Sequence, residues 1–84
     1  MDKLAIFSTA LKHGLSEEEI RQAWENFVAK RPRGDDCWVV IGFTSAGIEV
    51  ELVGLVTANG DTLVIHALSP ATARVKRELG IRRR

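Results

Sequence analysis

Apolar residues are concentrated in three runs in the middle of the chain. Runs rich in Val, Ile, Leu, Trp and Phe occupy Cys37–Phe43, residues 48–57 and residues 62–67, and short segments containing Gly or Asn-Gly separate them. β-Branched and aromatic residues bounded by such turns are typical of strands, and Asn-Gly favours a tight hairpin. We therefore predict a three-stranded antiparallel meander that organises the rest of the chain.

Side chains alternate between the two faces of a strand, so the pattern also assigns faces. On the second strand one face is charged at first and apolar later, in the order Glu49, Glu51, Val53 and Leu55. We expect the last helix or another chain to cover the later half of this face, and water to cover the first half. On the third strand, strict alternation places His66 on the same face as Val64, opposite to Ala67.

Helical spacing of apolar residues predicts two helices before the sheet. The first covers residues 2–12 and stops at Gly14. The second begins at Ser16, where Glu19 completes a capping box, and ends before Pro32, and residues 30–36 should form an exposed connection. Its apolar stripe, which should cover the sheet, consists of Ile20, Ala23, Trp24, Phe27 and Val28.

A third helix is predicted after the sheet, from the entry signal Ser69-Pro70 to about Leu79. The expected fold class is therefore α+β, a three-stranded antiparallel β-meander packed with two N-terminal helices and one C-terminal helix. Residues 1–80 should form a single domain, and residues 81–84 a basic C-terminal tail.

The net charge of +1 conceals an uneven distribution. Residues 70–84 carry six basic side chains and one acidic side chain, so their charge is +5 and that of residues 1–69 is −4. The carboxyl end is a candidate surface for a polyanion, although a solvated helix face would look the same. The 84 residues contain no apolar run of membrane-spanning length and no apolar signal segment, which predicts a cytoplasmic protein without a membrane partner.

The candidate chemistry rests on two histidines and their basic neighbours. The spacings of His, Cys and carboxylates match no metal site, and the glycines match no phosphate-binding loop, so we expect no metal and no cofactor. Histidine can act as a general acid or base near neutral pH, and cations can neutralise a phosphate. This set suits metal-independent RNA cleavage, with His66 and His13 as catalytic candidates. The phosphate contacts would be Lys12, Arg74 and Arg77. Each histidine also has a structural interpretation, at a strand end or a helix end.

Several motifs resemble the BrnT-like toxins, small ribonucleases of type II toxin-antitoxin systems with a RelE-like architecture. They are the sequence Lys-His-Gly-Leu-Ser at residues 12–16, the predicted strand Trp-Val-Val-Ile-Gly at 38–42, the Gly-Asp turn at 60–61, and Ala71-Thr72 before a basic helix. The resemblance covers most of residues 10–79. It implies a sheet flanked by helices, metal-independent endoribonuclease activity, RNA as substrate and a cognate antitoxin as partner.

The chain also departs from that family. Asp35-Asp36-Cys37 stands where the family has an arginine before the tryptophan, and His66-Ala67-Leu68 where it has Ser-Ala-Arg. The strands that precede the family's Lys-His pair are here replaced by the predicted first helix. Either His66 compensates as a catalytic group, or the chain keeps the fold without the activity. The alternative function is a non-catalytic interaction module that binds a partner, or a second copy as a homodimer, through Val53 and Leu55 on the sheet face.

Overall fold

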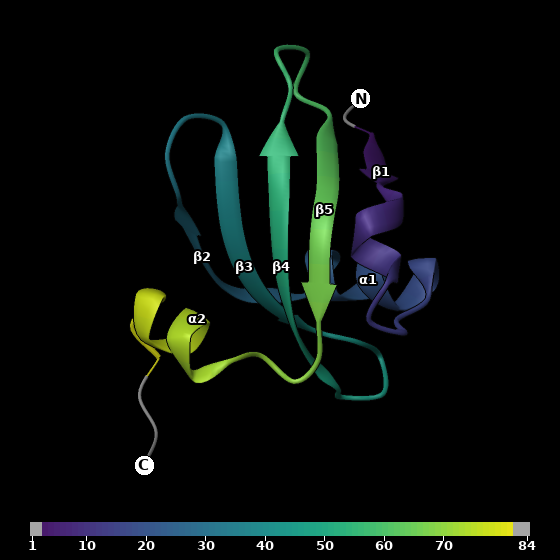
Figure 1. The fold of residues 1–84 in the computed structure, drawn as a ribbon, viewed down its shortest axis with the longest axis vertical. Coiled ribbons are helices and arrows are strands. Elements are labelled where there is room, and N and C mark those ends of the chain that lie inside the picture. The colour runs from purple at the N-terminus through teal and green to yellow at the C-terminus, as the bar shows by residue number, and fades with distance from the viewer. Residues whose placement is uncertain (1–2, 82–84) are drawn as a thin grey trace.

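The computed structural model describes residues 3–81, and these form one twisted five-stranded mixed sheet with short helices (Figure 1). The strands are β1 (Leu4–Ile6), β2 (Phe27–Pro32), β3 (Cys37–Phe43), β4 (Glu49–Val56) and β5 (Thr62–Leu68). The helical elements are the 3₁₀ helix η1 (Ser8–Leu11), α1 (Glu17–Glu25) and α2 (Ala73–Glu78). The order of strands across the sheet is β1-β5-β4-β3-β2.

The predicted meander is the centre of this sheet, but the predicted fold class is wrong. Strands β3, β4 and β5 are antiparallel neighbours, as the turns indicated. Two further strands extend the meander, β2 antiparallel to β3 and β1 parallel to β5. The result is a mixed sheet, because β1 is parallel to its neighbour while the other three pairings are antiparallel.

The first predicted helix, over residues 2–12, does not form in the described part of that range. Residues 4–6 form β1 and residues 8–11 form η1. Leu4 and Ile6, which fit an alternating pattern as well as a helical one, pack against the core under α1, whereas Phe7 remains 52% exposed. Pairing with β5 therefore overrides a short helical pattern, which could not sustain an isolated helix.

The second predicted helix is correct at its start and wrong at its end. The capping box between Ser16 and Glu19 is present, but α1 ends at Glu25 and β2 follows. Phe27 and Val28, expected in the buried stripe, are 47% and 61% exposed on an edge strand. Pro32 is tolerated in this strand because its position needs no N–H directed toward β3. It lies opposite Trp38, and the neighbouring Arg33 N–H makes the hydrogen bond to β3, to the Cys37 carbonyl.

The third helix begins later than predicted. Helix α2 starts at Ala73, and the Thr72 hydroxyl accepts the Val75 N–H as its cap. Ser69 does not cap the helix, because its hydroxyl donates to the Glu49 carbonyl at 2.6 Å. The connection from β5 is thus tied to the beginning of β4 before α2 begins. Of the predicted tail, residues 82–84 lie outside the described residues.

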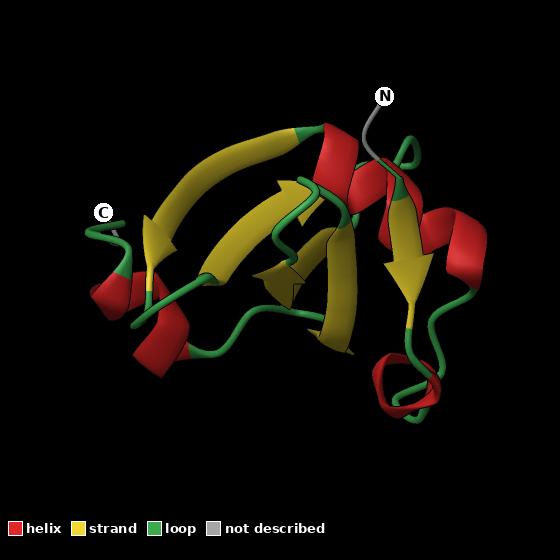
Figure 2. Ribbon diagram, turned by 90° about the horizontal axis from the view of Figure 1, so that it is seen from above, coloured by secondary structure: helices red, strands yellow, loops and turns green. Residues whose placement is uncertain are grey.

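The two longer helices cover opposite faces of the sheet (Figures 1 and 2). On one face, Ile20 and Ala23 of α1 pack with Val40, Val50 and Leu52. On the other face, α2 packs through Val75 on a second cluster that contains Val39, Ile41 and Val53. The expectation that the last helix covers the later half of the β4 face is therefore confirmed at Val53. Within residues 3–81, no helix combines the length and apolarity needed to cross a membrane.

Candidate functional site

A shift in strand register determines where His66 points. His66 is opposite Val53, whereas the next residue of β4, Gly54, is opposite Val64, so Ile65 is left without a partner. Such a bulge inserts one residue and reverses the alternation of side chains. The predicted faces of β5 are therefore wrong: Val64 and Ala67 both join the core under α1, and His66 lies on the face of α2.

On that face His66 is paired with a buried carboxylate. Its Nε2 lies 2.8 Å from Oε2 of Glu51, and Oε1 of Glu51 accepts the Thr72 N–H at 2.7 Å. Only 6% of Glu51 is exposed, so the expectation that water covers this part of β4 is wrong. Burial alone would raise the pKa of Glu51, but hydrogen bonds from Thr72 and His66 outweigh it and hold the pKa below its usual range.

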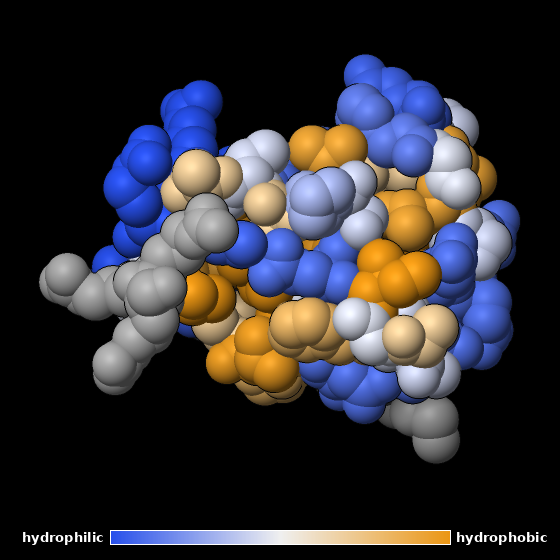
Figure 3. All heavy atoms as spheres, turned by 90° about the horizontal axis from the view of Figure 1, so that it is seen from below, coloured by the Kyte–Doolittle hydropathy of each residue, from blue (hydrophilic) through white to orange (hydrophobic). Residues whose placement is uncertain are grey.

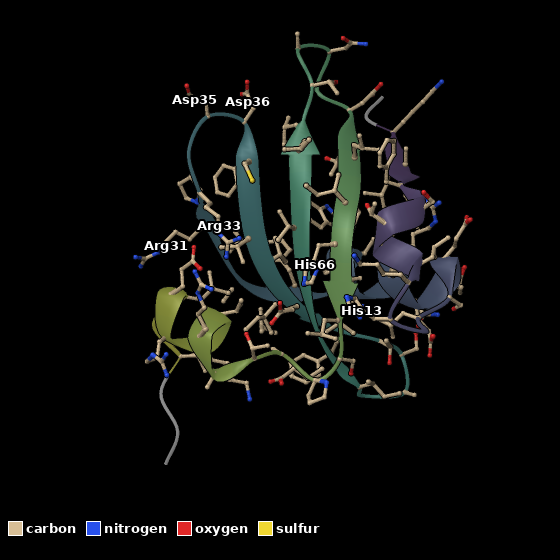
Figure 4. The ribbon with its side chains drawn as sticks, in the orientation of Figure 1. His13, Arg31, Arg33, Asp35, Asp36 and His66 are labelled. Atoms are coloured by element: carbon tan, nitrogen blue, oxygen red, sulfur yellow. The ribbon has the colours of Figure 1, made fainter. Side chains whose placement is uncertain are left out.

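The second histidine approaches the first from a neighbouring element. His13 lies in the turn after η1, and its ring centroid is 5.8 Å from that of His66 in an edge-to-face arrangement (Figure 4). Two hydrogen bonds hold η1 against β5: the Phe7 N–H donates to the Val64 carbonyl, and the Thr9 hydroxyl donates to the Ile65 carbonyl. The segment that carries His13 is thus fixed to the strand that carries His66.

The structure separates the predicted phosphate contacts into two places. Lys12 is exposed directly before His13, at the end of η1. Arg74 and Arg77 are exposed on α2, and within residues 3–81 His66 forms its hydrogen bond and ion pair with Glu51 rather than with either arginine. An ion pair between Glu78 and Arg33 connects α2 to the β2 edge of the sheet. Since β2 and β5 are three strand positions apart, roughly 14 Å separates that edge from β5.

Glu51 is the functional candidate that the sequence interpretation missed. A signal was present, because two glutamates interrupt an otherwise apolar strand. The other one, Glu49, also binds the connection to α2: its carboxylate accepts the Ala71 N–H at 3.1 Å and lies 3.2 Å from Nζ of Lys76. Both carboxylates therefore fasten this connection, but only Glu51 also contacts a histidine.

The arrangement is suited to proton transfer. A neutral His66 can donate to Glu51 only if its proton is on Nε2, which leaves the lone pair of Nδ1 as a base. His13 is exposed and places a second imidazole 5.8 Å from the first, between ring centroids. Within residues 3–81, no three His, Cys, Asp or Glu side chains cluster as a metal site would require.

Comparisons with known proteins assign no family to this chain. No protein-family model matches it, and neither the curated proteins nor the solved structures contain a match.

Proposed function

We propose that this chain is a metal-independent endoribonuclease whose catalytic groups are His66 and His13. The observation that carries the proposal is the approach of the two imidazoles to 5.8 Å between ring centroids, with Glu51 orienting one of them. When the 2′-hydroxyl of an RNA attacks the adjacent phosphate, one group must accept the proton of the hydroxyl and another must donate a proton to the leaving oxygen. Two neighbouring imidazoles can supply both.

The proposed reaction assigns the role of base to His66 and the role of acid to His13. Nδ1 of His66 takes the proton of the 2′-hydroxyl, and the oxygen attacks the adjacent phosphorus. The bond from phosphorus to the 5′-oxygen breaks, and protonated His13 gives its proton to that oxygen. The products are a 2′,3′-cyclic phosphate and a free 5′-hydroxyl. Lys12, exposed beside His13, would neutralise charge on the phosphate in the transition state.

The proposal includes the biological setting that the resemblance implies. The chain would be a BrnT-like toxin in the cytoplasm, neutralised by a cognate antitoxin. The presence of β1 supports the resemblance, because a strand precedes Lys12 and His13 here as strands precede the Lys-His pair in that family. The alternative interaction module has less support, since α2 covers Val53 on the face it would use and leaves Val53 only 9% exposed.

The test is cleavage of a fluorescent RNA oligonucleotide by the purified protein in EDTA. We expect His66→Ala and His13→Ala each to lower the rate by about 10²- to 10⁴-fold, the usual contribution of general acid-base catalysis. Lys3→Ala is the matched control, because Lys3 is an exposed basic residue beside β1, and it should cleave like the wild type. Wild-type activity in both histidine variants would refute the assignment.

A further inference from the structure

A second group of basic side chains surrounds Glu78, away from the histidine pair. Arg33 donates to this carboxylate twice, from Nε at 3.0 Å and from Nη2 at 2.7 Å. Such a two-point contact fixes the plane of the guanidinium and ties the β2–β3 connection to α2. In Figure 4, Arg31 on β2 and Arg33 just after this strand lie on the α2 side of the sheet, while His13 and His66 lie on its β5 side.

Two more arginines stand next to this ion pair. Arg31 is two residues before Arg33 and shares its face of the strand, and Arg74 precedes Glu78 by four residues on one face of α2. The pKa of Glu78 is lowered mainly by the hydrogen bond from Arg33; burial opposes this, and the charges of Arg33, Arg74 and Arg31 each lower the pKa by a smaller amount. Glu78 contacts Arg33 directly, and Arg31 and Arg74 act on it through their charge, so the four groups together carry a charge of +2.

This arginine surface, formed by Arg31, Arg33 and Arg74, is exposed and polar. Ion pairs within residues 3–81 do not involve Arg31 or Arg74, so their donors are free to bind a ligand. Within residues 3–81, no exposed large apolar side chain lies in α2 or in residues 29–36, although Phe27 and Val28 are exposed at the start of β2. Figure 3 shows hydrophilic side chains gathered at the left, on the α2 side of the molecule.

The chemistry of this surface favours phosphates over an acidic protein. Guanidinium groups bind phosphate oxygens through two hydrogen bonds at once, and an exposed polar surface suits a solvated backbone. A protein interface usually has an apolar centre, whereas the exposed apolar residues of β2, Phe27 and Val28, lie at the start of the strand and not between the arginines. Strand addition at β2 is also disfavoured, because Lys30 and Pro32 lie on this edge strand.

We propose that the arginine surface binds the phosphate backbone of single-stranded RNA and holds the strand while its scissile phosphate lies at the histidine pair. This inference rests on the proposed function. The roughly 14 Å between the β2 edge and β5 places the contacts away from the cleaved bond, so they contribute to binding rather than to proton transfer. Arg33 is held by Glu78, while Arg31 and Arg74 supply free donors.

The experiment measures the anisotropy of a labelled, fully 2′-O-methylated RNA oligonucleotide, which binds but cannot be cleaved because the attacking hydroxyl is blocked. We expect Arg31→Gln and Arg74→Gln each to weaken binding by about tenfold, and to lower the slope of log K against log salt by about 0.7. Glu78→Gln should tighten binding, because it removes the only negative charge in the cluster. Lys3→Gln, the matched control, should bind like the wild type.

The outcomes separate this inference from the proposed function. Normal affinity in Arg31→Gln and Arg74→Gln would overturn the inference, even if RNA cleavage depended on both histidines. Competition by oligoglutamate at equal charge concentration would also overturn it, because the surface would then favour an acidic protein. Weakened binding in the arginine variants would support it, and would do so even if an unmodified RNA remained uncut, which would refute the proposed function alone.

Discussion

Replacing Glu51 by Gln tests whether this side chain positions a catalytic histidine or only fastens a loop. The glutamine has the same shape, and its Oε1 can still accept the Thr72 N–H. Its amide nitrogen, however, is a donor and cannot accept the Nε2–H of His66. It would instead donate to Nε2, so the proton of a neutral His66 would move to Nδ1 and the lone pair proposed as the base would be lost.

The magnitude follows from the contacts that change. A hydrogen bond to a charged group is worth roughly 1.5–3 kcal/mol, and one of the two at Glu51 is altered, so we expect a loss of about 2 kcal/mol of unfolding free energy. For a domain of this size that corresponds to a fall in Tm of roughly 8–16 °C. The rate of RNA cleavage should fall by about 10²- to 10⁴-fold, as for removal of the base itself.

The assay combines urea unfolding followed by circular dichroism with RNA cleavage in EDTA, well below the melting temperature. Glu49→Gln is the matched control: Glu49 binds the same connection through Ala71 and Lys76 but contacts no histidine. It should lose similar stability and keep its cleavage rate. Equal cleavage by Glu51→Gln and the wild type, or equal loss of cleavage in both variants, would refute the positioning role.

Three further predictions concern the same elements. His13→Ala should lower the cleavage rate by about 10²- to 10⁴-fold while changing the unfolding free energy by no more than about 0.5 kcal/mol, because the side chain is exposed; a large loss of stability in urea would contradict this. Gly42→Ala should destabilise the fold by about 3 kcal/mol or more, since its Cβ would collide with the Ala23 carbonyl of α1, and an unchanged urea midpoint would exclude that contact. Because the folded pKa of Glu51 is lowered, its stabilisation should be full above its ordinary pKa of about 4.3 and lost as the pH falls through the folded value. Acid titrations of the melting temperature should therefore be flatter for Glu51→Gln than for the wild type.

The central meander was predictable because its signals are local. Turn residues and runs of β-branched and aromatic residues specify β3, β4 and β5 within a few residues of one another. The outer strands were not predictable in this way, because residues 4–6 and residues 27–32 also fit a helical spacing. Their strand conformation depends on partners 58 and about 10 residues away in the sequence, which local periodicity does not reveal.

The candidate site, too, was predictable only in the part that local sequence determines. His13 and His66 could be selected from their chemistry alone, but their proximity depends on η1 packing against β5 and on the bulge at Ile65. The bulge also explains why Glu51 was missed. Strict alternation places His66 on the face of Val64, whereas the bulge places it on the opposite face, beside Glu51. Arg33 was assigned to an exposed connection, and only the position of α2 gives it a partner in Glu78.

The most direct measurement is the chemistry of the cut ends in EDTA, on an RNA oligonucleotide and on the same oligonucleotide with 2′-deoxy nucleotides at the cleaved positions. The account predicts that the RNA yields 2′,3′-cyclic phosphate and 5′-hydroxyl ends, and that the deoxy-substituted positions remain uncut. Cleavage at the deoxy positions, or no cleavage of either oligonucleotide by a folded protein, would contradict the assignment of His66 and His13 as a catalytic pair.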